Sequence, residues 1–211
     1  MDQNVIQQNA LPTALRILGI VLSVGVAIAS YRYVAGVGFV PDLVATNSLI
    51  SPWLLIHVLG SATALLVGPF QFLTAPRPSK RGIHRALGRV YVVGCLVGAV
   101  SGIPLAWGAS TGVISTMGFG LLAVAWFATV ATGWRKAVEG KIAEHREWMI
   151  RSFALTFAAV TLRLYLPIAG MLPIDFADGY RAISFLCWVP NLAVVELWLI
   201  RRRSVPALAS N

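Results

Sequence analysis

The sequence predicts an all-α membrane protein, a polytopic bundle of six transmembrane helices, and two observations carry this prediction. Hydrophobic residues make up 57% of the 211-residue chain and charged residues 12%, whereas a soluble domain is about 45–50% apolar and about 25% charged. Apolar runs of about 20 residues recur along the chain, each long enough to cross roughly 30 Å of hydrocarbon as a helix. We therefore expect one integral membrane domain over residues 1–211.

The predicted helices cover residues 15–34, 53–73, 85–107, 113–138, 147–167 and 182–200. The first run is long for a signal peptide, so we expect an uncleaved span. Trp53 marks an interfacial start for the second helix, and Pro69 is expected to kink that helix. Pro167 is expected to end the fifth helix, and Pro190 to interrupt the sixth.

Lysine and arginine cluster in the second-to-third loop, the fourth-to-fifth loop and the C-terminal tail. Positive loops stay in the cytoplasm, which places both termini there. The same clusters, within a formal net charge of +9, favour contact with anionic lipid head groups. Nucleic-acid binding is not expected, because no soluble domain remains to perform it.

Small residues predict close helix packing. Gly94, Gly98 and Gly102 form two consecutive GxxxG spacings, which let membrane helices approach closely. This face could pack within the chain or against a second copy, so a homo-oligomer or a membrane-protein partner is possible. Cys95 and Cys187 lie inside apolar segments and are expected to be packing residues.

A polar stripe runs along residues 144–167. At about 100° per residue, Ser152, Thr156 and Arg163 return to within about 20° of His145 on a helix. His145 and Arg163 are nevertheless about 27 Å apart along the helix axis. We therefore interpret this stretch as a strut that links two separate polar sites.

The first candidate site lies at the cytoplasmic face and contains His84 and His145. Two histidines on two helices could ligate one haem b, with arginines pairing its propionates. A divalent metal completed by Glu144 or Glu147 is an alternative, and so is simple contact of the two histidines with lipid phosphates. The arginines in question are Arg85, Arg89 and Arg146.

The second candidate site lies near the outer face and contains His57 and Arg163, with Tyr165, Asp175 and Asp178 as further candidates. Ionisable groups at membrane depth usually face the bundle interior. The simpler alternatives are an interhelical hydrogen bond for His57 and snorkelling to head groups for Arg163. The depth difference excludes one metal site that contains all three histidines.

No catalytic motif is present, so an enzyme is not favoured. The remaining carboxylate inside an apolar run, Glu196, is expected to pair with Arg151 or the terminal arginines, or to relay protons. Three functions stay open: a haem- or metal-binding redox-associated protein, a transporter of a small polar or anionic solute, and a structural or assembly partner.

Two His-Arg motifs carry a family resemblance. They read His84-Arg-x-x-Gly-Arg-Val-Tyr91 and His145-Arg-x-Trp-Met-Ile-Arg-Ser152. With residues 154–167 and 68–71, they make residues 54–167 resemble a family of uncharacterised bacterial membrane proteins, a domain of unknown function. The resemblance implies a bacterial multi-pass membrane protein and supplies no activity, and we expect the cytoplasmic membrane as its location. The histidine placement is also similar to that of membrane cytochromes, at the level of the fold alone.

Overall fold

The structure is a computed structural model that describes residues 3–38, 42–74, 79 and 81–208. It is all-α, and its helices vary in length from one turn to seven or more. They are α1 (Gln3–Ser30), α2 (Arg32–Ala35), α3 (Asp42–Ala45), α4 (Trp53–Thr74), α5 (Arg81–Trp107), α6 (Val113–Val138), α7 (Ile142–Thr156), α8 (Ala158–Met171), α9 (Phe176–Leu186) and α10 (Val189–Leu208).

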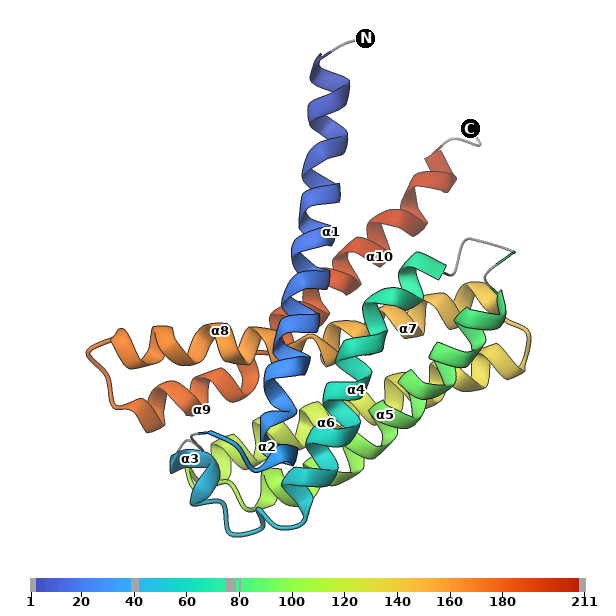
Figure 1. Ribbon diagram of the computed structural model, residues 1–211. Helices are drawn as coiled ribbons and strands as arrows, with labels where there is room; N and C mark the ends of the chain where they lie inside the picture. Colours follow the sequence, from blue (N-terminus) through green and yellow to red (C-terminus); the bar gives the residue numbers. More distant parts are fainter. Residues whose placement is uncertain (1–2, 39–41, 75–78, 80, 209–211) are drawn as a thin grey trace.

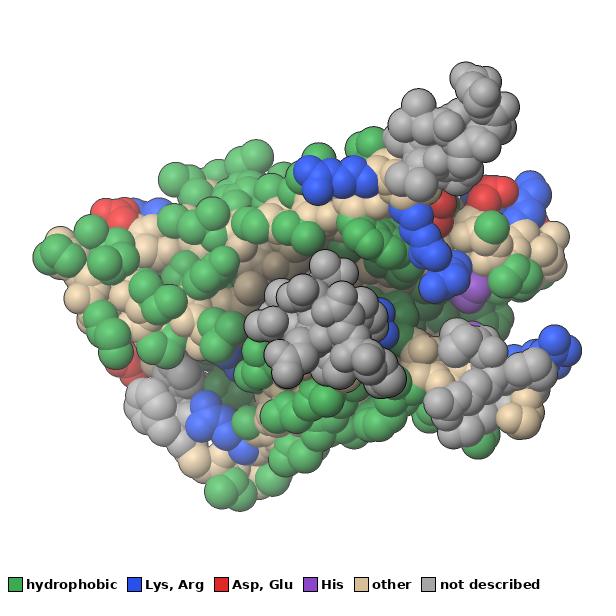
Figure 2. All heavy atoms as spheres, turned by 90° about the horizontal axis from the view of Figure 1, so that it is seen from above, with side chains coloured by type: hydrophobic (Ala, Val, Ile, Leu, Met, Phe, Trp, Pro, Cys, Tyr) green, Lys and Arg blue, Asp and Glu red, His purple; other side chains and the backbone are tan. Residues whose placement is uncertain are grey.

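Six helical stretches in the described part of the chain are long and apolar enough to cross a membrane, which confirms the predicted fold class. They are Thr13–Ala35, Trp53–Thr74, Arg81–Trp107, Val113–Val138, Ile142–Met171 and Phe176–Arg203. Hydrophobic side chains are spread over much of the face shown in Figure 2, and charged side chains lie in small groups among them, several of which are toward the right. A lipid bilayer is therefore the environment of this protein.

Helices α4 to α7 pack in sequence order, each against the next, and α10 packs on α7 (Figure 1). The short helices α8 and α9 form a hairpin that extends to the left in Figure 1, and α9 packs on α6. Helix α1 packs mainly on α4. The main apolar core lies among α4, α5, α6 and α7 and includes Ala64, Tyr91, Trp126 and Leu155.

The glycine face of α5 packs within the chain, against α4. A Cβ atom added to Gly94 would lie 2.8 Å from the backbone oxygen of Gly60. A Cβ added to Gly60 would lie 2.7 Å from the backbone nitrogen of Gly98. These distances are too short for any side chain, so the two helices touch backbone to backbone. The predicted close approach is thus an intramolecular contact.

The last two membrane segments are each broken in the middle. The fifth divides at Phe157 into α7 and α8, and the sixth divides at Cys187 and Trp188 into α9 and α10. Pro190 explains the second break, because its ring clashes with the carbonyl four residues earlier. The expectation that Pro167 ends the fifth helix was wrong, since α8 continues through this proline to Met171.

Side chains tie the two breaks together. The Asn191 side-chain amide donates to the carbonyl of Cys187 at 3.0 Å, to the carbonyl of Ala154 at 3.3 Å and to the Thr161 hydroxyl at 2.9 Å. The single hydroxyl hydrogen of Thr161 is in turn shared between the carbonyl of Cys187 at 2.8 Å and that of Phe157 at 3.0 Å. Backbone carbonyls beside the breaks therefore find partners without water, as hydrocarbon surroundings require.

Two ends of the bundle differ in character. We call the end with the Lys136–Glu144 connection and the last turn of α4 the basic end. The opposite end, which carries residues 42–50 and 105–112, is called the cavity end because it contains the cavity described below.

Candidate functional site

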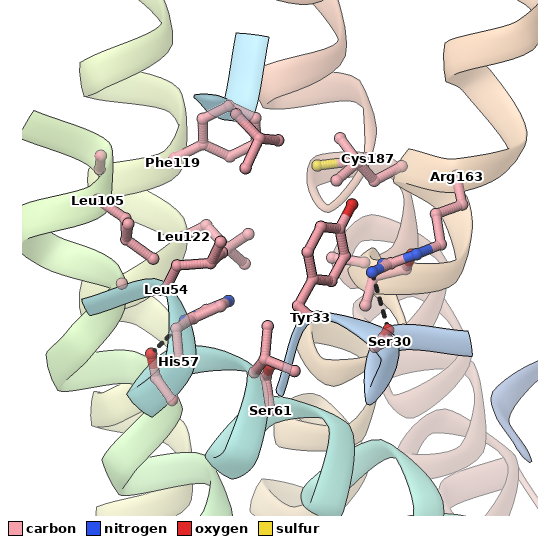
Figure 3. A pocket seen from close by; sticks show the side chains of 18 of the residues that line it. Ser30, Tyr33, Leu54, His57, Ser61, Leu105, Phe119, Leu122, Arg163 and Cys187 are labelled. Carbon is pink, nitrogen blue, oxygen red and sulfur yellow. Dashed lines mark hydrogen bonds between the residues drawn. The ribbon is translucent and has the colours of Figure 1, made fainter. Parts of the chain in front are cut away.

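A cavity of about 860 Å³ lies at the cavity end, among α1, α4, α5, α6, α8 and α9 (Figure 3). Cavities of this size hold drug-sized ligands. Most of its wall is apolar, formed by side chains such as Leu54, Leu105, Phe119 and Leu122. Its lining extends from the helix breaks to the connections that follow α3 and α5. The cavity therefore reaches from inside the bundle toward one membrane surface.

His57 enters this cavity from α4. Its Nδ1 lies 2.8 Å from the carbonyl oxygen of Gly98 on α5. A carbonyl oxygen can only accept, so Nδ1 carries the hydrogen, and the Nε2 atom of the neutral ring is an acceptor. The ring points its other nitrogen toward the cavity in Figure 3. The predicted interhelical hydrogen bond and a cavity-facing acceptor therefore coexist in one side chain.

Arg163 enters the same cavity from α8. Its guanidinium donates to the carbonyl of Ala159 at 2.8 Å and to the Ser30 hydroxyl of α1 at 2.9 Å. Both acceptors are neutral, and no carboxylate of the described residues lies within ion-pair distance of it. An arginine has five N–H donors in a planar fork that suits a carboxylate or a phosphate. The half-buried guanidinium of Arg163 therefore has no counter-ion among the residues that the structure describes.

His57 and Arg163 thus line one cavity, as the sequence-based pairing proposed. The other candidates for this site lie elsewhere. Asp175 caps α9 by accepting from the backbone N–H of Ala177 at 2.7 Å, and Asp178 forms an ion pair with Arg181. Tyr165 packs in the apolar cluster between α8 and α9.

Several polar lining residues were not identified from the sequence. They come from α1 to α3 and from mid-helix positions: Ser30, Arg32, Tyr33, Asp42, Trp126 and Tyr180. Arg32 stacks over the Tyr33 ring at 4.8 Å and donates to its hydroxyl at 3.1 Å. The adjacent pair Arg32 and Tyr33, directly after the first membrane span, could have indicated a polar site at this end of the bundle. Arg32 is one of the few basic residues on that side.

A buried hydrogen-bond network lies below the cavity, between it and the basic end. The Tyr91 hydroxyl bonds to the Ser152 hydroxyl at 3.0 Å and to the Thr156 hydroxyl at 2.9 Å. The Trp126 indole N–H donates to the Thr156 hydroxyl at 2.9 Å. We call these four residues the partition. The polar stripe of the fifth segment is therefore divided: Ser152 is dry and packed, Thr156 borders the cavity, and Arg163 projects into it.

The other two histidines lie at the basic end, and their Nδ1 atoms have opposite roles: that of His145 donates to a carbonyl, and that of His84 accepts from an amide. Nδ1 of His145 lies 2.8 Å from the carbonyl of Gly133 near the end of α6. Nδ1 of His84 lies 3.2 Å from the Thr74 hydroxyl at the end of α4. The Gln71 amide, oriented with its nitrogen toward His84, donates to this ring nitrogen at 3.0 Å. The two histidines lie close enough to interact electrostatically.

The third predicted metal ligand is engaged elsewhere, because Glu144 pairs with Lys136 at 2.7 Å. Across the described ranges, no three His, Cys, Asp or Glu side chains are grouped so that they could hold a metal ion. Cys95 and Cys187 are free and buried, as expected for packing residues. The predicted propionate partners are all exposed; they are Arg85, Arg89 and Arg146.

Ion pairs dominate the rest of the basic end. Arg151 on α7 binds Glu196 on α10 through two hydrogen bonds of 2.5 and 3.0 Å, which confirms the predicted salt bridge. Arg203 pairs with Glu147. In the turn after α6, Lys141 lies 3.0 Å from Glu139. The neighbouring ammonium groups of Lys141 and Lys136 hold the pKa of the Glu139 carboxyl below its usual value.

The fold and the cavity define a class: a polytopic helical membrane protein with a largely apolar cavity, into which an arginine projects that has no counter-ion among the described residues. Residues 54–199 match the family described as "Predicted membrane protein (DUF2306)", a domain of unknown function. This match covers well over half of the chain, so the protein belongs to that family. No curated protein and no solved structure matches it significantly. Helix α1 and the cavity residues Ser30, Arg32, Tyr33 and Asp42 lie outside the matched range.

Proposed function

We propose that this protein is a transporter of a small solute with an anionic group, and that the cavity is its binding site. One observation carries the proposal: Arg163 projects into the cavity, and among the described residues only the neutral Ala159 carbonyl and Ser30 hydroxyl are bonded to it. Burying a charge without a partner is costly, and a bound anion removes that cost.

The helix breaks support the same proposal. Transporters commonly form their substrate sites where membrane helices are interrupted near the bilayer midplane. Here Cys187, at one break, lines the cavity, and Phe157, at the other, directly follows the cavity residue Thr156. The partition closes the cavity toward the basic end, so in this conformation the solute does not enter from that end. Transport would require the partition to open.

Cysteine labelling from each membrane face tests the proposal. Ser61 lines the cavity, whereas Ser101 on α5 is buried outside it, so each becomes a single cysteine in a background of Cys95→Ala and Cys187→Ala. We expect a membrane-impermeant methanethiosulfonate to modify Ser61→Cys from both faces of the membrane and Ser101→Cys from neither. Modification from one face alone contradicts transport, and no modification of Ser61→Cys contradicts the site itself.

We also propose that the protein lies in the bacterial cytoplasmic membrane with both termini in the cytoplasm and its basic end against anionic head groups. The positive charge of the basic end supports this orientation. A reporter enzyme that is active only in the cytoplasm should be active when it is fused after Arg203. Activity of a periplasmic reporter fused at the same position would contradict the orientation.

A second candidate function is redox-associated binding of haem b or a divalent metal by His84 and His145. The favourable observation is the 2.8 Å contact from His145 Nδ1 to a backbone carbonyl, which leaves Nε2 available, as in metal-binding histidines. Bound haem would supply one-electron chemistry. An absorption spectrum of purified protein tests it: a Soret band lost in His145→Ala supports this function, and colourless, metal-free protein contradicts it.

A further inference from the structure

The walls of the cavity indicate the shape of its ligand. Arg163 and Ser30 lie on one side, and His57 lies on the other, beside Leu54 and Leu122 (Figure 3). A fully hydrated solute would lose its water to these apolar walls without compensation. The ligand therefore needs an apolar body between two polar groups.

The charge of the cavity indicates the charge of the ligand. Arg32, Arg163 and Asp42 are the charged side chains of its lining, which leaves a net charge of +1 when His57 is neutral. Arg32 is stacked on Tyr33 and exposed, so the buried share of this charge belongs to Arg163. A single negative charge neutralises the site, and a carboxylate matches the guanidinium fork in two parallel hydrogen bonds.

The opposite wall selects a different group. Because the Gly98 carbonyl fixes the hydrogen on Nδ1, the cavity-facing Nε2 of neutral His57 accepts and does not donate. No described residue is hydrogen-bonded to Nε2. A hydroxyl on the ligand is the complementary donor, whereas a second carboxylate would be repelled by the acceptor lone pair.

The wall formed by α1 indicates the entrance. Within the part of the chain that the structure describes, two polar contacts hold the end of α1 and α2 to the bundle: Ser30 to Arg163 at 2.9 Å and Tyr31 to Thr63 at 2.7 Å. A carboxylate that binds Arg163 competes directly with Ser30 for the same donors. Binding therefore releases one of the two contacts that close this wall, and the outer surface of α1 carries exposed apolar side chains such as Val21 and Ile28.

We propose that the ligand is an amphipathic monocarboxylate with a hydroxyl group, which enters from the bilayer beside α1. Its carboxylate binds Arg163, its hydroxyl donates to Nε2 of His57, and its alkyl body contacts the apolar side chains between them. This inference rests on the proposed function, because it names the solute class of the same cavity.

The test is equilibrium binding to the full-length protein in nanodiscs of neutral phosphatidylcholine. The probes are decanoate, 10-hydroxydecanoate and decyltrimethylammonium. We expect the hydroxy acid to bind about tenfold more tightly than decanoate and the cation not to bind. Arg163→Met should weaken both acids by more than about tenfold, and Arg163→Lys should weaken them less.

Two further variants separate the polar groups. His57→Phe should abolish the preference for the hydroxy acid while decanoate still binds, since the Nε2 acceptor is lost. The variant also removes the Nδ1 hydrogen bond to the Gly98 carbonyl, which keeps the Ser101 hydroxyl as a donor at 3.2 Å. Arg135→Met removes one positive charge at the exposed basic end and should leave both affinities unchanged. The route of entry is tested by adding the hydroxy acid from the lipid phase in one experiment and from water in another. Equal loading rates in the two experiments would contradict entry from the bilayer.

The outcomes distinguish this inference from the proposed function. Equal affinities for decanoate and decyltrimethylammonium, or full binding by Arg163→Met, would overturn the ligand class. If Ser61→Cys reacts from both faces and no carboxylate binds, the ligand class is wrong and the transport proposal stands. If Ser61→Cys does not react at all, both are wrong.

Discussion

Arg151 and Arg163 lie twelve residues apart on one membrane segment, yet their surroundings are opposite. Arg151, on α7, is clamped by Glu196 at 2.5 Å and lies 3.8 Å from Glu147. Arg163, on α8, has a neutral carbonyl and a neutral hydroxyl as its bonded partners. The first arginine is compensated by the protein itself, and the second requires compensation from outside. This difference distinguishes a structural cation from one that is available to a ligand.

The partition between the two arginines should give the largest effect. Thr156→Val removes the hydroxyl shared by Tyr91 and Trp126, and it leaves the buried indole N–H of Trp126 without an acceptor. We expect the free energy of unfolding to fall by roughly 2–4 kcal/mol, measured by denaturation in detergent. The matched control Thr116→Val, whose hydroxyl makes only an exposed 3.4 Å contact, should change stability little.

Removing the structural cation should give the next largest effect. Arg151→Met breaks both hydrogen bonds to Glu196 and leaves that carboxylate partly desolvated. Because Glu196 is 39% exposed, solvent screening limits the loss to about 1–2 kcal/mol of unfolding free energy. The double variant Arg151→Met/Glu196→Leu should recover part of the loss. No recovery would show that the ion pair is not the cause.

The smallest effect is expected at the solvent-facing turn of the basic end. Glu139 is exposed, and its pKa is lowered by Lys141 and Lys136. A lowered folded-state pKa gives stability that is present above the unfolded value of about 4.3 and lost as the pH falls through the folded value. Glu139→Gln should therefore shift the unfolding midpoint slightly or not at all at pH 7, and any difference should vanish once the pH has fallen below the lowered folded-state pKa. A large shift at pH 7 would contradict this description.

The features of the fold that the lipid environment imposes could be predicted from the sequence. Span length and hydropathy predict six membrane helices, and the spacing of Gly94, Gly98 and Gly102 predicts a close helix contact. That contact is the α4–α5 seam. The break at Phe157 could not be predicted, because no proline or glycine marks it. Hydroxyls that bond back to the helix backbone flank it instead: Thr156 to Ser152 at 2.9 Å and Thr161 to Phe157 at 3.0 Å.

The candidate site was predicted in part. The histidine and arginine inside apolar segments, His57 and Arg163, were identified because ionisable groups at membrane depth are rare. Tyr33, Asp42 and Trp126 were not identified, since their place in the cavity depends on how α1, α3 and α6 fold around α8. Periodicity assigned Ser152 and Arg163 to one stripe, and only tertiary packing shows that one is sealed in the partition and the other faces the cavity.

The most direct test of the account compares the unfolding free energy of Arg163→Met with that of the wild-type protein, without added ligand. Arg163 has no ion pair within the described residues, so its removal relieves a buried charge and breaks only two hydrogen bonds to neutral groups. We predict that Arg163→Met is at least as stable as the wild type, within about 0.5 kcal/mol, although Arg151→Met is destabilised. A loss from Arg163→Met as large as that from Arg151→Met would show that Arg163 is a structural residue and would contradict the ligand site.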